Sequence, residues 1–112
     1  MKILITGAAG LVGSHLARRL AGEHEVLALR HGDLDITDRA VVGRCLLHEK
    51  PALIFNCAVL QVDDSEQQPA KAEAVNVAGP RCLAEAANDI GAEIELTLRF
   101  SNARQSRTTT LV

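Results

Sequence analysis

Apolar and polar positions are distributed along the chain as short aliphatic runs separated by longer amphipathic segments. The runs are bounded by glycine, proline or polar residues, which is typical of parallel strands covered on both faces. In the segments between them, apolar residues return every three or four positions, the spacing of one face of a helix. This pattern predicts strands at Lys2–Thr6, Glu25–Leu29, Ala52–Asn56 and Ile94–Leu98, and helices at Leu11–Ala21, Asp38–Glu49 and Pro69–Asn88.

The predicted helices have recognisable ends and inward faces. Gly22 and Gly91 follow the first and third helices and are suited to end them, and Thr37 is the expected N-cap of the second. Pro80 lacks an N–H group and clashes with the carbonyl four residues back, so we expect a kink or a restart at Gly79-Pro80. The residues expected to face the core are Val12, Leu16 and Leu20 in the first helix, Val41, Val42, Cys45 and Leu46 in the second, and Val75, Ala78, Cys82 and Ala86 in the third.

The alternation of strands and helices predicts an α/β fold. Because crossovers between parallel strands are right-handed, the helices should cover both faces of one parallel sheet. We predict a Rossmann-type, doubly wound parallel sheet limited to about four strands in the order 3-2-1-4, with a ligand crevice at the switch point beside the first strand. This partial dinucleotide-binding domain takes up residues 1–98, and residues 99–112 form an irregular polar tail. Because the fourth strand would be an edge, self-association through that edge is expected.

Composition narrows the class of protein further. The chain has 112 residues, 47% of them hydrophobic and 2% aromatic, which fits one domain with a small aliphatic core. A net charge of −2 gives no indication of a nucleic acid partner, and the longest apolar run, Ala52–Leu60, is too short to span a membrane. Three cysteines lie singly in apolar segments, which indicates reduced thiols, no metal site and a cytoplasmic protein.

A glycine-rich turn follows the first predicted strand and precedes the first helix. Gly7, Gly10 and Gly13 have the spacing G-x-x-G-x-x-G, a longer relative of the dinucleotide-binding fingerprint. Backbone N–H groups at the start of a helix lack internal partners and carry partial positive charge, so they attract phosphate. Gly7 would allow the tight turn, Gly10 the approach of a pyrophosphate, and Gly13 the close packing of helix and strand. The turn therefore predicts a dinucleotide site.

The loop after the second strand bears on which dinucleotide binds. An acid there bonds the ribose 2′-hydroxyl of NAD, whereas an arginine favours the 2′-phosphate of NADP. Arg30 directly follows the strand and favours NADP(H) over NAD(H), while Asp33 keeps NAD(H) open. The alternative is that Arg30 is a solvated loop residue, in which case it selects neither cofactor.

Further motifs along the chain follow in the order found in a known family. They are Asp35-Ile36-Thr37-Asp38, Pro51-Ala52-Leu53-Ile54-Phe55-Asn56-Cys57-Ala58, Val62-Asp63-Asp64-Ser65-Glu66 and Asn76-Val77-Ala78-Gly79-Pro80. With these motifs the chain resembles the dTDP-4-dehydrorhamnose reductase branch of the extended short-chain dehydrogenases/reductases, over about residues 1–94. The resemblance implies hydride transfer between NAD(P)H and a nucleotide-linked ketosugar.

The resemblance also implies individual roles in binding the cofactor. Gly10, Leu11 and Val12 match the family's pyrophosphate-binding turn, Asp35 and Ile36 match a pair beside the adenine, and Cys57, Ala58 and Val59 match the segment that lines the nicotinamide ribose. Together with Gly7, Gly13 and Arg30, these residues make up the predicted cofactor site.

The sequence departs from the family at the catalytic residues. In the family, the fourth strand leads to a Tyr-x-x-x-Lys pair, whose tyrosine exchanges a proton with the substrate oxygen. This chain contains no tyrosine, and the family pattern stops after Ile94, so we assign no catalytic residue. Two functions stay open. The chain is either a member of the reductase family that is inactive in isolation, or a non-catalytic dinucleotide-binding fragment with no enzymatic role.

Overall fold

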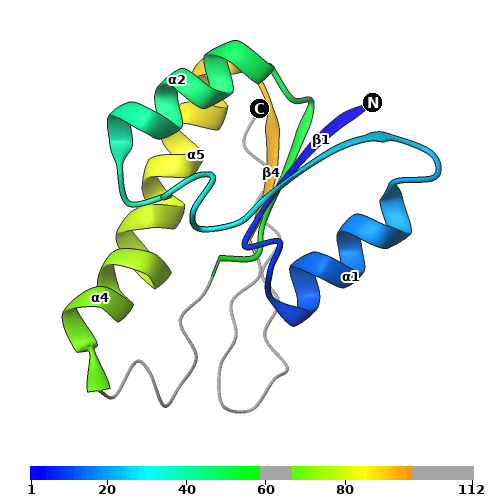
Figure 1. The fold of residues 1–112 in the computed structure, drawn as a ribbon. Coiled ribbons are helices and arrows are strands. Elements are labelled where there is room, and N and C mark those ends of the chain that lie inside the picture. Colours follow the sequence, from blue (N-terminus) through cyan, green and yellow to red (C-terminus); the bar gives the residue numbers. More distant parts are fainter. Residues whose placement is uncertain (59–66, 97–112) are drawn as a thin grey trace.

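The computed structural model describes residues 1–58 and 67–96. Within them, parallel strands form one sheet in the order β2-β1-β3-β4 (Figure 1). The strands are β1 (Lys2–Thr6), β2 (Glu25–Leu29), β3 (Leu53–Asn56) and β4 (Glu93–Leu96). The helices are α1 (Leu11–Leu20), α2 (Arg39–Glu49), α4 (Pro69–Glu73), the π-helical turn η1 (Ala74–Ala78) and α5 (Gly79–Ile90). The Rossmann-type α/β fold predicted from the sequence is confirmed.

Helices cover both faces of the sheet and divide the core into two clusters. On one face, Leu16 and Leu20 of α1 pack against a cluster that includes Ile5 of β1. On the other face, α2 and α5 pack against each other and against the sheet (Figure 1). This second cluster contains Leu4, Ile54 and Ile94 from the strands, Val42 and Leu46 from α2, and Leu83 and Ala87 from α5. Neighbouring residues of β1 thus point to opposite faces, and both faces are buried.

The predicted strand order 3-2-1-4 is wrong, because β3 pairs with β1 and not with β2. The composition of the two strands accounts for the difference. The run Leu53-Ile54-Phe55 of β3 is apolar throughout and favours a place between two neighbours, whereas β2 begins with Glu25, which an edge tolerates. In the structure Ile54 and Asn56 are buried, and Glu25 and Ala28 are exposed. The switch point therefore lies between β1 and β3, whose following helices cover opposite faces of the sheet.

The third helical region restarts where proline predicts it. Helix α5 begins at Gly79, next to Pro80. The Gly79 N–H donates to the carbonyl of Ala74, five residues back, and this bond closes the π-helical turn η1. At its other end α5 is followed by Gly91 in the left-handed conformation, with φ +72°, which confirms the predicted C-terminal cap.

The predicted cap of the second helix is wrong by one residue. Helix α2 begins at Arg39, and the side chain of Asp38 accepts a hydrogen bond from the N–H of Val41 at 3.2 Å. Thr37 instead donates to the side chain of Asp35 from both its backbone N–H and its hydroxyl. Thr37 and Asp38 both have side chains that can cap a helix, and in the structure Asp38 is the N-cap.

Two residues expected to face the core are exposed, Val12 in α1 and Ala78 in η1. Val12 is 38% exposed because it lies in the first turn of α1, ahead of Leu16 and Leu20, which pack against the sheet. At Ala78 the π turn adds a residue to the helical repeat, and this rotates Pro80 into the core in its place. The other positions predicted to face the core are buried or partly buried.

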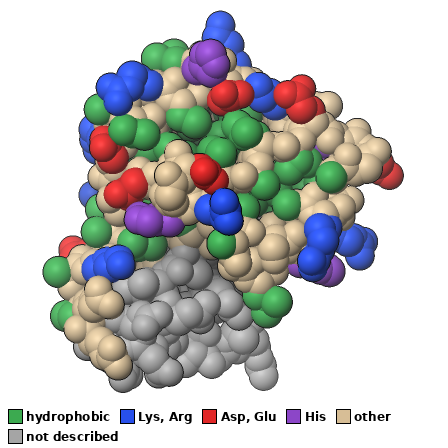
Figure 2. All heavy atoms as spheres, viewed as in Figure 1, with side chains coloured by type: hydrophobic (Ala, Val, Ile, Leu, Met, Phe, Trp, Pro, Cys, Tyr) green, Lys and Arg blue, Asp and Glu red, His purple; other side chains and the backbone are tan. Residues whose placement is uncertain are grey.

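Some sequence predictions fall outside the described residues, namely Val59, the end of the fourth predicted strand and the tail 99–112. Among the residues that are described, no helix is long and apolar enough to cross a bilayer, and no group of side chains could hold a metal ion. On the face shown in Figure 2, acidic and basic side chains are interspersed. The described side chains of that face therefore form no continuous basic surface of the kind that binds nucleic acid.

Candidate functional site

The turn between β1 and α1 presents a helix N-terminus with no side-chain cap. Gly7 adopts the left-handed conformation at φ +65°, and its carbonyl accepts the N–H of Gly10 at 3.1 Å. Gly10 is the N-cap of α1 and has an extended backbone conformation. Among the described residues, no side chain forms a capping hydrogen bond at this end of α1. The first N–H group bonded within the helix in the usual way is that of Ser14, to the Gly10 carbonyl. The N–H groups of the first turn are thus available to an anion.

The three glycines of this turn differ in the space around them. A Cβ atom at Gly7 would lie 2.5 Å from the backbone nitrogen of Ala58, and one at Gly13 would lie 2.3 Å from the carbonyl oxygen of Gly7. Both positions exclude a side chain because backbone lies against them. A Cβ atom at Gly10 would meet only the Gly7 oxygen, at 3.3 Å. The space beside Gly10 is therefore open to a ligand.

A buried polar pair joins the ends of β1 and β3 at the switch point. The Thr6 hydroxyl donates to Oδ1 of Asn56 at 2.6 Å, and both residues are buried. The same Asn56 oxygen accepts the N–H of Ala58 at 3.3 Å, and the Cys57 N–H donates to the Thr6 carbonyl at 3.2 Å. These bonds join the segment after β3 to the end of β1, directly before the glycine turn. Burial raises the pKa of the Cys57 thiol above its ordinary value, which keeps that thiol protonated and unreactive.

The loop after β2 forms the third wall. Leu34 and Ile36 are buried and anchor the loop on the core. Between them, Oδ1 of Asp35 accepts the Thr37 hydroxyl at 2.6 Å and the Thr37 N–H at 2.9 Å. These bonds, the hydroxyl first, hold the pKa of Asp35 below its ordinary value, and the positive charges of His31 and Lys71 act in the same direction.

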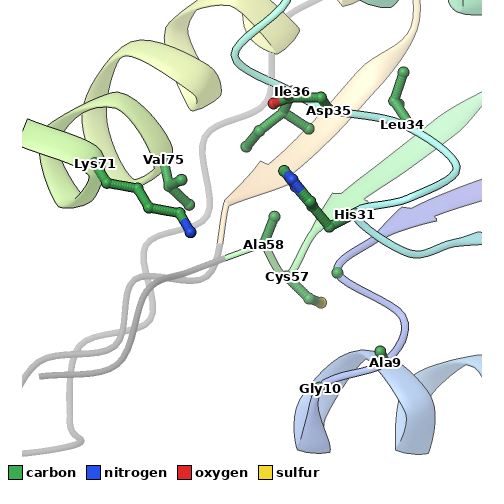
Figure 3. Close-up of a pocket in the computed structure, with 11 residues that line it drawn as sticks. Ala9, Gly10, His31, Leu34, Asp35, Ile36, Cys57, Ala58, Lys71 and Val75 are labelled. Carbon is green, nitrogen blue, oxygen red and sulfur yellow. The ribbon is translucent and has the colours of Figure 1, made fainter. Parts of the chain in front are cut away.

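These three walls enclose a cavity of about 240 Å³ at the carboxyl ends of β1, β2 and β3. Six of the predicted cofactor residues line it: Gly7, Gly10, Asp35, Ile36, Cys57 and Ala58. Five residues that the sequence did not single out also line it: Ala9, His31, Leu34, Lys71 and Val75. The close-up in Figure 3 shows the contributions of the glycine turn, the loop after β2, the end of β3 and helix α4. One cavity therefore brings together segments that lie far apart in the sequence.

Four predicted cofactor residues do not line this cavity. Leu11, 75% exposed, and Val12 project from the first turn of α1, and Gly13 is buried beneath the turn. Arg30 is also outside, with a side chain that is 70% exposed and a guanidinium Nε 3.8 Å from Oδ2 of Asp33. The first three can still contribute backbone N–H groups to an anion, whereas Arg30 can act only through its side chain.

Two cationic or hydrogen-bonding side chains in the cavity were missed. His31 comes from the loop after β2, and Lys71 comes from α4 on the opposite wall (Figure 3). In the sequence, His31 is the next residue after Arg30 and could have been weighed beside it. Nothing in the local pattern around Lys71 distinguishes it from an ordinary exposed helix residue.

Comparison with known proteins identifies the family. A sequence model of the family described as RmlD substrate binding domain matches residues 1–96. The chain belongs to this family. The dTDP-4-dehydrorhamnose reductase of Streptomyces griseus is 46% identical over 94 residues, which cover 80% of this chain and 30% of that protein. The resemblance drawn from the sequence motifs is thus confirmed.

Solved structures of related proteins have the same fold. The dTDP-4-dehydrorhamnose reductase of Clostridium acetobutylicum matches with a TM-score of 0.80 and 42% identity, over 84% of this chain and 34% of that one. The enzyme of that name from Bacillus anthracis, solved in complex with NADP, matches with a TM-score of 0.78 and 30% identity, over 83% of this chain and 34% of that one. The chain therefore spans about a third of the length of the relatives that it matches.

Proposed function

We propose that the chain binds a nicotinamide dinucleotide in the cavity beside the glycine turn. One observation carries the proposal: the uncapped start of α1 and the carboxyl ends of β1, β2 and β3 all open onto the same cavity. A pyrophosphate at the turn would accept N–H groups of Leu11 and Val12. The adenine half would extend towards Asp35 and Ile36, and the nicotinamide ribose towards Cys57 and Ala58.

We further propose that the dinucleotide is NADP(H) in preference to NAD(H). The relative from Bacillus anthracis was solved with NADP. In this chain, His31 follows β2, and both His31 and Lys71 line the cavity. Cationic groups at this end of a dinucleotide fold favour a 2′-phosphate over a 2′-hydroxyl. Family membership supports hydride transfer to a nucleotide-linked ketosugar as the reaction that such a bound cofactor serves.

The chain of 112 residues is expected to have no reductase turnover by itself. It contains no tyrosine, and the reaction of the family depends on a tyrosine that exchanges a proton with the substrate oxygen. General acid catalysis of this kind contributes about a hundredfold to ten-thousandfold in rate. The isolated chain would therefore act as a dinucleotide-binding module, which was the alternative function left open by the sequence. An NADPH oxidation assay with a nucleotide-linked ketosugar tests this, and turnover near an ordinary ~10 s⁻¹ would contradict it.

Binding can be measured through the change in the fluorescence of NADPH itself. Gly10→Val is the decisive variant. Gly10 has φ −75°, which valine adopts, and the added side chain would fill the place of the pyrophosphate. Gly22→Val is the matched control, because Gly22 lies in open space away from the cavity. We expect wild type and Gly22→Val to bind and Gly10→Val to lose binding. Equal affinity of all three proteins would refute the proposed site.

We also propose that the chain self-associates through β4. Among the described strands, β4 is the edge of the sheet next to β3. Its unpaired N–H and C=O groups would be a template for pairing with a second copy. Sedimentation velocity tests this proposal, with dimers or larger species expected, and a monomer at all concentrations would contradict it.

A further inference from the structure

We infer that His31 and Lys71 form an anion-binding position at the adenosine end of the cavity, and that this position holds a phosphate on the adenosine ribose of the dinucleotide. The inference rests on the proposed function and deepens it, because it names the side chains that select the cofactor. It also moves that role away from Arg30, to which the sequence had given it.

The first support is the placement of the two side chains. His31 follows β2, at the place where dinucleotide folds contact the adenosine ribose. Lys71 lies on α4, one helical turn before Val75, and both line the opposite wall. In Figure 3 the Lys71 ammonium and the His31 ring point towards each other across the cavity. A group that sits between the walls can therefore receive hydrogen bonds from both.

The second support is that neither side chain is occupied. In the described part of the chain, no carboxylate lies within ion-pair distance of His31 or Lys71, and neither makes a side-chain hydrogen bond. Both are exposed at the mouth of the cavity, so a ligand can reach them. Arg30 differs on each count, because its guanidinium is outside the cavity and is already beside the carboxylate of Asp33.

The third support is the electrostatic balance of the cavity. Among the described residues that line the cavity, Asp35 is the one acidic residue. The Oδ1 atom of Asp35 already accepts two hydrogen bonds from Thr37, which fix it on the loop after β2. The charges of His31 and Lys71 both reach this carboxylate and favour its ionised form. The two cationic side chains would offset the repulsion between a phosphate dianion and the carboxylate of Asp35.

The test compares variants for their preference between NADPH and NADH. Lys71→Gln and His31→Gln each remove a proposed contact, and both keep a side chain of similar length. Arg30→Gln is the matched control, since it removes one positive charge from an exposed side chain just outside the cavity. Each protein is titrated with NADPH and with NADH. Adenosine 2′,5′-bisphosphate and adenosine 5′-monophosphate are then used as competitors, to separate the 2′-phosphate from the rest of the nucleotide.

We expect Lys71→Gln and His31→Gln each to lower the affinity for NADPH and for adenosine 2′,5′-bisphosphate by about fivefold. This factor corresponds to the upper end of the free energy that an exposed charge pair contributes. Their affinity for NADH and adenosine 5′-monophosphate should stay unchanged, as should that of Arg30→Gln for all four ligands. If Lys71→Gln lowers the affinity for NADH and for NADPH by the same factor, the inference is overturned, because the lysine would then contact a part that both cofactors share. A loss of preference in Arg30→Gln alone would overturn it as well. If wild type binds neither cofactor, the proposed function itself fails, and the inference fails with it.

Discussion

Two glycines with similar positive φ angles allow the packing at the switch point to be measured. Gly7 and Gly91 are both left-handed, at φ +65° and φ +72°. A Cβ atom at Gly91 would meet nothing within 4 Å, whereas one at Gly7 would lie 2.5 Å from backbone atoms of Cys57 and Ala58. At either position the positive φ strains an alanine. Only at Gly7 must the segment after β3 also move away from the glycine turn.

The expected losses of stability follow from these two contributions. A left-handed conformation costs an alanine roughly 1–2 kcal/mol, and this is the whole cost expected for Gly91→Ala. Forcing atoms into a closely packed place adds about 1–3 kcal/mol. Gly7→Ala should therefore lower the free energy of unfolding by about 2–5 kcal/mol. Gly7→Ala should also lower the affinity for NADPH, because Cys57 and Ala58 line the cavity. Gly91→Ala should leave that affinity unchanged.

Urea unfolding followed by far-ultraviolet circular dichroism measures both losses on one scale. Where Gly7→Ala is too unstable for a complete transition, trimethylamine oxide in all samples restores the folded baseline. Equal losses in the two variants would show that the backbone around Gly7 relaxes freely. That result would refute the expectation that the close packing of the turn against the segment after β3 resists an added methyl group.

Three further substitutions test single features of the structure. Thr37→Val removes a hydrogen bond that lowers the pKa of Asp35. In an NMR titration of the variant, the pKa of Asp35 should be higher than in wild type. The lowered pKa of Asp35 stabilises the fold above the pKa of an unfolded aspartate, and this stabilisation is lost as the pH falls. In the variant the stabilisation should be smaller. Thr6→Val removes the buried donor to Asn56 and should cost about 1–3 kcal/mol in urea unfolding; no cost would mean that water replaces it. Gly43→Ala, in open space within α2, should raise the thermal midpoint through a gain of about 0.5–1 kcal/mol.

The parts of the fold that depend on local sequence could be predicted. The bounds of β1 and β2, the restart at Gly79 and the cap at Gly91 all agree with the structure. Each is decided within a few residues, by aliphatic runs, by the missing N–H group of proline, or by the freedom of glycine. The glycine turn belongs here too, since its spacing and its neighbours specify a strand, a tight turn and a helix start.

The strand order could not be read in the same way. Periodicity shows that a strand is buried but not on which side of β1 it pairs, and a crossover of either kind satisfies the handedness rule. A comparison of the strands themselves held the missing clue. The run Leu53-Ile54-Phe55 is apolar throughout, whereas β2 begins with Glu25. Weighing which strand could better tolerate an edge would have placed β2 outside and β3 inside.

The sequence also could not show which side chains after β2 face the cavity. The position after β2 identifies where an adenosine ribose would lie, but not which side chain turns towards it. In this chain the loop folds back at once, since the carbonyl of Arg30 accepts the N–H groups of Asp33 and Leu34 at 2.9 and 3.0 Å. Asp33 in turn accepts the Arg30 N–H at 3.0 Å. This tight turn keeps the arginine beside Asp33 and outside the cavity, while the next residue, His31, faces inward. Its partner Lys71 comes from a helix forty residues further along the chain, so only the assembled fold could pair the two.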